Sequence, residues 1–175
     1  MRRLRPWSPI QDAPAVLAAF LASDDLHRQP PPIRDLAEAR AYLEAIVDEG
    51  WAIDDGTPDA PRAVGCVLAS ERDARHGTAW MSYWLAPAAR GRGLASAGLD
   101  AASRILLADG LHRLELGARA NNPASIAVAE RAGYVREGVE RERLRYGAER
   151  FDVVRLARLA TDPAPASDPL PVEEA

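Results

Sequence analysis

The sequence predicts a single mixed α/β domain, because strand-like and helical patterns alternate along a chain of 175 residues. With 47% apolar residues, a chain of this length can bury a sizeable core in one domain. The predicted order is one strand, two helices, three strands, a helix, a strand, a helix and two strands. The strands cover 1–7, 51–53, 64–70, 78–85, 111–117, 134–145 and 149–159, and the helices cover 10–22, 35–49, 94–109 and 122–132.

Two amphipathic helices follow the N-terminal strand. Segment 10–22 gathers its large apolar residues on one face, and Asp12 followed by Pro14 suits a helix start. Segment 35–49 repeats this pattern, and Gly50 is a typical stop. Two strands then flank a turn rich in Asp, Gly and Pro.

The second half alternates helices and strands. Segment 94–109 carries apolar or small residues at helical spacing, which permits close packing on a sheet. In 111–117, leucines alternate with charged residues, as in a half-buried strand. The short helix 122–132 has Asn122 as a good N-cap and Gly133 at its C-terminal left-handed position. The last two strands form a hairpin.

Composition excludes several classes of protein. The net charge of −4 argues against a generic nucleic-acid binder. The single cysteine, Cys66, rules out an internal disulfide framework, and its apolar neighbours indicate a buried structural thiol. The histidines and the cysteine show no metal-ligand spacing, so we expect no metal. We find no membrane-length apolar run and no signal-peptide pattern, and we therefore expect a cytoplasmic protein.

The C-terminal segment 161–175 differs from the rest of the chain. It is rich in proline and acidic residues and has few large apolar side chains. Such a composition predicts a disordered tail that follows a domain covering 1–160.

A glycine-rich turn, Arg90-Gly91-Arg92-Gly93-Leu94-Ala95, joins the strand 78–85 to the helix 94–109. Glycines there allow positive φ angles and a close backbone approach, and the helix N-terminus attracts an anion. An ordinary loop with two solvated arginines is the plain alternative. The turn matches neither the P-loop nor the dinucleotide-binding fingerprint.

The spacing Arg90-x-x-Gly93-x-Ala95 resembles the acetyl-CoA pyrophosphate loop of the GNAT N-acetyltransferase superfamily. Two downstream segments, 121–125 and 129–134, are similar to those of its ribosomal-protein N-terminal acetyltransferase (RimJ/RimL-like) type. The resemblance covers about 4–159. It implies the GNAT fold: a central, twisted, mostly antiparallel mixed sheet flanked by helices.

The resemblance also implies the residues of the site. Acetyl-CoA, as cosubstrate, would contact Trp84, Leu85, Arg90, Gly91, Arg92, Gly93, Leu94, Ala95, Asn122 and Ser125. The strand end at Trp84 and Leu85 would splay from its neighbour and pair with the pantetheine arm. Ser125 is the candidate catalytic residue that gives a proton or a hydrogen bond to the leaving thiolate, unless this thiolate leaves without a side-chain acid. Many members of the superfamily place a tyrosine acid at the position of Ala129, so this chain departs from their pattern.

The sequence leaves the general base open. Glu115, Asp24, Asp25, His27 and a chain of water molecules are the alternatives. Each side chain has a plain structural explanation as well, such as an exposed charge on a strand.

These observations predict an enzyme that moves an acetyl group from acetyl-CoA directly to a primary amine. The resemblance favours the α-amine of a protein N-terminus, whereas small amines such as antibiotics or polyamines stay open. A non-catalytic acyl-CoA-binding module and a nucleotide phosphate-binding domain are the other hypotheses. We expect no nucleic-acid or membrane partner, and a monomer or a homodimer.

Overall fold

The computed structural model describes residues 2–23, 25–26, 32–166 and 168–173. In these ranges every predicted helix and strand is present, with ends shifted by a few residues. The strands are β1 (Arg3–Pro6), β2 (Gly50–Asp54), β3 (Ala63–Asp73), β4 (Thr78–Leu85), β5 (Arg113–Arg119), β6 (Val135–Tyr146) and β7 (Glu149–Leu159). The helices are α1 (Pro9–Leu21), α2 (Leu36–Ile46), α3 (Leu94–Ala108) and α4 (Pro123–Arg131), and a short 3₁₀ turn covers Pro87–Ala89.

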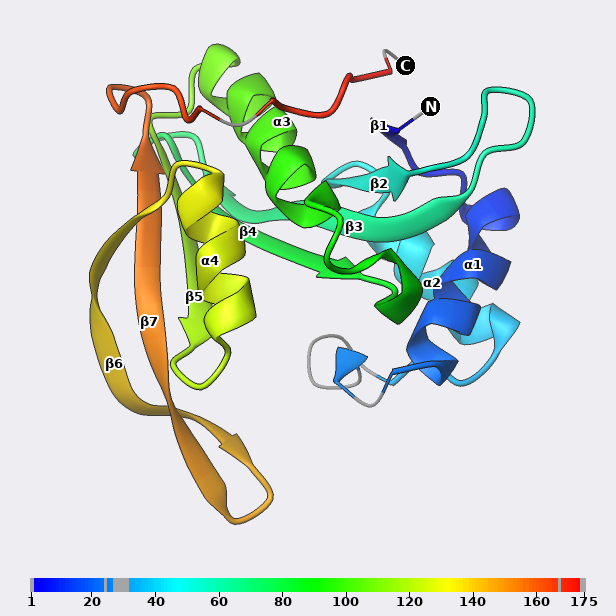
Figure 1. The fold of residues 1–175 in the computed structure, drawn as a ribbon, viewed down its shortest axis with the longest axis horizontal. Helices are drawn as coiled ribbons and strands as arrows, with labels where there is room; N and C mark the ends of the chain where they lie inside the picture. The colour runs from blue at the N-terminus through cyan, green and yellow to red at the C-terminus, as the bar shows by residue number, and fades with distance from the viewer. Residues whose placement is uncertain (1, 24, 27–31, 167, 174–175) are drawn as a thin grey trace.

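The strands form one seven-stranded sheet in the order β1-β2-β3-β4-β5-β7-β6. Each neighbouring pair is antiparallel except β4 and β5, which run parallel. A parallel pair needs a crossover connection, and α3 provides it (Figure 1). The mostly antiparallel mixed sheet expected from the sequence is therefore confirmed.

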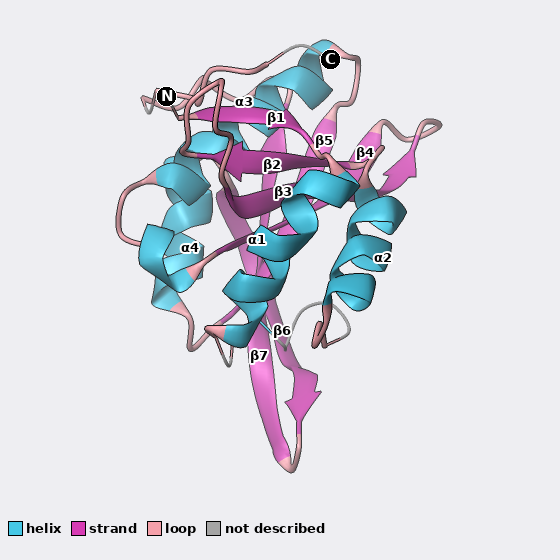
Figure 2. Ribbon diagram, turned by 90° about the vertical axis from the view of Figure 1, so that its right-hand side faces the viewer, coloured by secondary structure: helices cyan, strands magenta, loops and turns pink. Residues whose placement is uncertain are grey.

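Helices cover the two faces of the sheet in pairs. On one face, α3 and α4 pack on a core that includes Leu99, Leu114 and Leu156. On the other, α1 and α2 lie side by side over the first strands (Figure 2), around Phe20 and Trp84. Helices thus cover both faces of the sheet beside the end of β4, where Trp84 and Leu85 are buried. Within the described residues, no helix combines the length and the apolar character needed to cross a bilayer.

The described part of the C-terminal segment lies along the domain and contacts β1 and α3. Leu4 on the edge strand β1 donates its N–H to the Pro171 carbonyl and accepts from the Glu173 N–H, both at 2.8 Å. Leu170 is only 7% exposed, and its N–H donates to the Ala97 carbonyl of α3. Free backbone groups of an edge strand and one buried leucine thus give the segment partners that its composition does not reveal. Figure 1 shows it crossing α3 toward β1.

Candidate active site

The parallel strands β4 and β5 separate partway along their length. Their paired residues run only from Thr78 and Arg113 to Trp80 and Glu115. Beyond that point β4 continues to Leu85 and β5 to Arg119, and Figure 1 shows the two strands diverging. We call this opening the wedge. Because the strands no longer pair with each other there, their backbone groups can bind an extended ligand.

The glycine-rich turn lies at the open end of β4. Gly91 and Gly93 have φ angles of 73° and 75°, and a Cβ on either would meet no atom within 4 Å. Gly93 is the N-cap of α3, and no side chain caps this helix. The first N–H groups of α3 therefore face open space, which is the arrangement that binds anions.

The two arginines of the turn are engaged by carboxylates. Arg90 donates to the Leu85 carbonyl at 3.2 Å and to Asp25 at 3.0 Å. Arg92 donates to Asp55 at 2.8 Å, and Arg62 contacts the same carboxylate. Anion attraction at the turn thus comes chiefly from backbone N–H groups, and Arg90 braces the turn against the end of β4.

The carboxylates that hold these arginines stay ionised near neutral pH. Partial burial alone would raise the pKa of Asp25, but hydrogen bonds from Arg90 and Ser23 lower it below its usual value. The pKa of Asp55 is likewise lowered, because Arg92 and Arg62 outweigh its burial. A carboxylate with a lowered pKa is a weak general base.

Ser125 lies at the N-terminus of α4, across the wedge from β4. The Asn122 side chain caps this helix and accepts from the Ser125 N–H at 3.1 Å. The Tyr83 hydroxyl on β4 lies 2.6 Å from the Ser125 hydroxyl and donates to the Ser125 carbonyl at 2.8 Å. Burial raises the pKa of Tyr83 to about 12, although the Ser125 hydrogen bond lowers it in part. Two coupled hydroxyl groups therefore lie at the wedge, with the phenol protonated.

Tyr83 is the functional candidate that the sequence analysis missed. Ala129, where many superfamily members have a tyrosine, is fully buried in the core beneath α4. The phenol next to this helix comes instead from β4. The one signal in the sequence was a tyrosine close to the end of the strand that precedes the turn. Because aromatic residues are common in strands, its position alone does not indicate a functional role.

A cavity of about 470 Å³ connects the turn with Ser125, and we call it the loop cavity. Its lining includes every predicted cofactor-binding residue except Arg92. Segments from β4, the turn and the first turns of α3 and α4 thus meet around one space.

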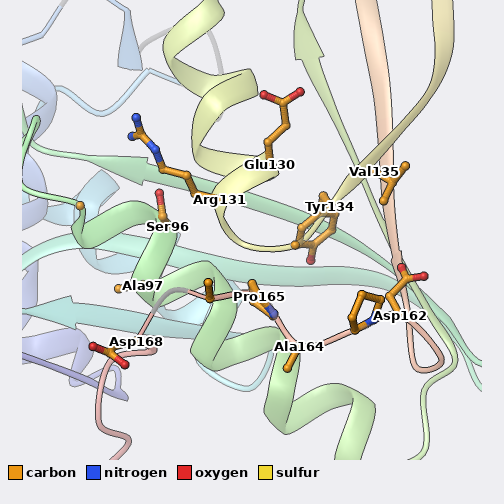
Figure 3. Close-up of a pocket in the computed structure, with 14 residues that line it drawn as sticks. Ser96, Ala97, Glu130, Arg131, Tyr134, Val135, Asp162, Ala164, Pro165 and Asp168 are labelled. Atoms are coloured by element: carbon orange, nitrogen blue, oxygen red, sulfur yellow. The ribbon is translucent and has the colours of Figure 1, made fainter.

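A second cavity, of about 770 Å³, lies between the first turn of α3, the last turn of α4 and the C-terminal segment, and we call it the tail cavity. Figure 3 shows Ser96 from α3, Arg131 from α4 and Pro165 from the C-terminal segment around it. Gly93, Ser96 and Arg131 also line the loop cavity, so the two spaces adjoin. The Ser96 hydroxyl is buried, and it has no hydrogen-bond partner in the described part of the chain. It can donate to a ligand at the α3 N-terminus.

A third cavity, of about 190 Å³, continues the wedge toward the β6–β7 hairpin, and we call it the hairpin cavity. Tyr83, Asn122 and Ser125 line it as well as the loop cavity. Its other end is lined by Arg119 and Tyr146, among others. The two hydroxyl groups therefore lie where the two cavities meet.

The candidate bases divide into three groups. Glu115 contacts Arg113 at 2.7 Å and Arg155 at 3.6 Å, and it lines none of the three cavities. Asp25 lines both the loop and hairpin cavities but is paired with Arg90. Asp24 and His27 lie outside the described residues. Among the residues that the structure describes, no group of three His, Cys, Asp or Glu side chains could hold a metal ion.

Solved structures with the same fold include several acetyltransferases. A GNAT-family acetyltransferase from Bacillus anthracis is 19% identical, with a TM-score of 0.78 over 93% of this chain and 100% of that chain. RimL, a ribosomal L7/L12 α-N-protein acetyltransferase solved with coenzyme A, is 21% identical, with a TM-score of 0.77 over 89% of this chain and 92% of RimL. A SpeG spermidine N-acetyltransferase chimera, combining Vibrio cholerae and hSSAT sequences, is 20% identical, with a TM-score of 0.76 over 91% of this chain and 96% of the chimera.

These similarities at low identity support the fold, whereas no curated protein matches the sequence. The family model that describes the acetyltransferase (GNAT) domain matches residues 2–135, which is most of the chain. The chain therefore belongs to the GNAT family of acetyl-CoA-dependent N-acetyltransferases.

Proposed function

We propose that this enzyme acetylates the α-amine of a peptide or protein N-terminus, by direct transfer within the wedge between β4 and β5. The observation that carries the proposal is the Tyr83–Ser125 hydroxyl pair, which lies where the loop and hairpin cavities meet. One cavity suits a cofactor and the other an acceptor, so the acetyl group would pass between them beside these hydroxyls.

The cofactor would extend along the loop and tail cavities. Its pyrophosphate would accept hydrogen bonds from backbone N–H groups of 91–96 and from the orphaned Ser96 hydroxyl. Its pantetheine arm would pair with backbone groups near Trp84 and Leu85, where β4 has left β5. Its adenosine end would enter the tail cavity, because the two cavities adjoin at Gly93 and Ser96.

The transfer forms one C–N bond and breaks one C–S bond. A neutral amine in the hairpin cavity would attack the thioester carbonyl, and the thiolate would leave. The proton lost by the amine nitrogen would replace the one that the sulfur gains, so that an amide and a thiol result. Ser125 would give this sulfur a proton or a hydrogen bond, with Tyr83 holding the serine hydroxyl in place. The pKa of Tyr83, about 12, keeps its phenol a donor throughout the physiological range.

The choice of a terminal α-amine rests on two points. The 121–125 and 129–134 segments resemble the RimJ/RimL-like type, and RimL is among the structural neighbours. The hairpin cavity is small, about 190 Å³, which suits one terminal residue. SpeG shares the fold and is a spermidine N-acetyltransferase, so polyamines must be tested beside peptides.

Release of the free CoA thiol measures acetyl transfer directly. The purified protein with acetyl-CoA is offered N-terminal peptides, spermidine and small amines, and the acetylated product is identified by mass spectrometry. We expect CoA release that depends on an N-terminal peptide, and thermal stabilisation by acetyl-CoA. Tight acetyl-CoA binding without any acetylated product would indicate a binding module. Stabilisation by ATP alone would contradict the whole assignment.

A further inference from the structure

Arg119 at the end of β5 contacts aromatic rings, whereas the arginines around it contact carboxylates. Its guanidinium carbon lies 5.4 Å from the centroid of the Tyr146 ring and 5.5 Å from that of Phe151. None of the salt bridges found among the described residues includes Arg119, whereas Arg113 and Arg155 both contact Glu115. Aromatic rings hold a guanidinium in position without neutralising its charge. Arg119 is therefore a positioned cation that lacks a carboxylate partner in the described part of the chain.

The Arg119 side chain borders the space that the acceptor would occupy. Along β5, Leu116 and Ala118 are buried in the core under α3 and α4, so Gly117 and Arg119 lie on the opposite face. The indole of Trp80 covers Gly117 on that face, 3.3 Å from the position of a Cβ there. The hairpin cavity extends from this region to the Ser125 hydroxyl. An acceptor amine beside Ser125 would thus bring its neighbouring groups toward Arg119.

The charge around the hairpin cavity favours an anion. Of the described lining residues, only Asp25 and Arg119 are charged. Asp25 already bonds to Arg90, so its negative charge is compensated. A polyamine needs carboxylates to bind its several cations, and this lining offers no uncompensated carboxylate among the described residues. A carboxylate or phosphate, in contrast, would find an arginine whose planar fork suits it.

We propose, on the basis of the acetyl transfer within the wedge proposed above, that the acceptor is a primary amine bearing a nearby carboxylate or phosphate, which Arg119 binds. Two sources share this chemistry: a peptide whose second residue is acidic, and a small amino acid. Arg119 sets the preference among acceptors, and it does not touch the cofactor.

The test compares acceptors that differ only in charge. Two peptides begin with serine, followed by aspartate in one and lysine in the other, and free aspartate and spermidine complete the panel. We expect wild-type kcat/KM to favour the aspartate peptide over the lysine peptide by about tenfold or more, as for a hydrogen bond between charged groups. Arg119→Gln should remove this preference by raising KM, and Arg119→Glu should reverse it. Both variants should bind acetyl-CoA as the wild type does.

Arg141→Gln is the matched control, because Arg141 is an exposed arginine on β6 and lines none of the cavities. It should keep the wild-type preference. Acetylation of free aspartate as efficient as that of the peptide would identify the small-molecule source, and acetylation of the peptide alone the N-terminal source. Equal use of both peptides, a preference for spermidine, or an unchanged preference in Arg119→Gln would overturn the inference and leave the acetyltransferase assignment standing. Absence of acetyl-CoA binding, or of any acetylated product, would overturn both.

Discussion

The two sides of the wedge are built by different parts of the chain. On the cofactor side the contacts that we propose come mainly from the backbone: the glycine turn, the α3 N-terminus and the free edge of β4. On the acceptor side the lining consists of side chains such as Arg119 and Tyr146. The proposed binding of acetyl-CoA by backbone groups therefore follows from the fold, whereas the choice of acceptor depends on individual side chains.

The largest effect should come from the backbone at Gly93. We expect Gly93→Val to weaken acetyl-CoA binding about 100-fold, since losing two charge-assisted hydrogen bonds costs about 3 kcal/mol. Isothermal titration calorimetry measures the dissociation constant of acetyl-CoA for the variant and the wild type.

Gly110→Val is the control for the change at Gly93. Gly110 also has a positive φ, 100°, and an open Cβ position, but it lies at the other end of α3. Both variants should lose stability by about 1–2 kcal/mol from the left-handed backbone. Equal acetyl-CoA affinity in the two variants would show that the turn does not hold the cofactor.

Removing the Ser125 hydroxyl should slow the transfer itself. We expect Ser125→Ala to lower kcat about 100-fold, the low end for general acid–base catalysis. Tyr83→Phe should lower kcat about tenfold, because it removes the hydrogen bond that positions the Ser125 hydroxyl, together with the one to the Ser125 carbonyl. Since Tyr83 acts through Ser125, the double variant should be no slower than Ser125→Ala. Multiplying effects would mean that the two hydroxyls act independently, and an unchanged rate in Ser125→Ala would exclude it from the mechanism.

The C-terminal segment offers a test of where the adenosine end lies. Ending the chain after Asp162 removes Pro165 and Leu170 from the tail cavity and the core. We expect acetyl-CoA to bind about tenfold more weakly, from about 1–2 kcal/mol of lost apolar contact, while acetyl-pantetheine is unaffected. A chain ending after Glu173 serves as the control. If acetyl-CoA and acetyl-pantetheine both bound equally more weakly, well below the unfolding temperature, the adenosine end would not lie in the tail cavity.

The pH dependence of kcat tests whether Tyr83 works as a protonated phenol. Because burial raises its pKa from 10.0 to about 12, the phenol keeps its proton as pH rises through 10. The alkaline side of the kcat profile should therefore show no loss near pH 10. By linkage, this group's contribution to stability is complete below pH 10 and is lost as the pH approaches 12. A fall in kcat with an apparent pKa of 10, absent in Tyr83→Phe, would mean that the phenol titrates as an exposed one.

The smallest effect should come from Arg92. Its guanidinium pairs with Asp55, whose side chain is 1% exposed, and Arg92 is absent from the lining of the loop cavity. We expect Arg92→Gln to change acetyl-CoA affinity by less than about threefold, since a partly exposed ion pair contributes about 0–1 kcal/mol. A loss above tenfold would show that this arginine turns to the phosphates, and that side chains matter on the cofactor side too.

Features set by local backbone patterns could be predicted from the sequence. The order of helices and strands, the turn at 90–95 and the Asn122 cap depend on residues close together in the chain. Tyr83 and Ser125 are 42 positions apart, and Arg90 and Asp25 are 65 apart. No local pattern signals such pairs, because only the packed sheet brings them together. The course of the C-terminal segment escaped prediction for the same reason, since its partners lie on β1 and α3.

The central claim is that backbone groups at the wedge hold the cofactor, while side chains beyond it hold the acceptor. Amide NMR of the ¹⁵N-labelled protein, titrated with acetyl-CoA and then with an acceptor peptide, tests it most directly. We predict that acetyl-CoA shifts the amide signals of Gly91, Gly93 and Ser96, whereas those of Arg119 and Tyr146 move only when the peptide is added. Unmoved signals from the glycine turn at saturating acetyl-CoA would contradict the account.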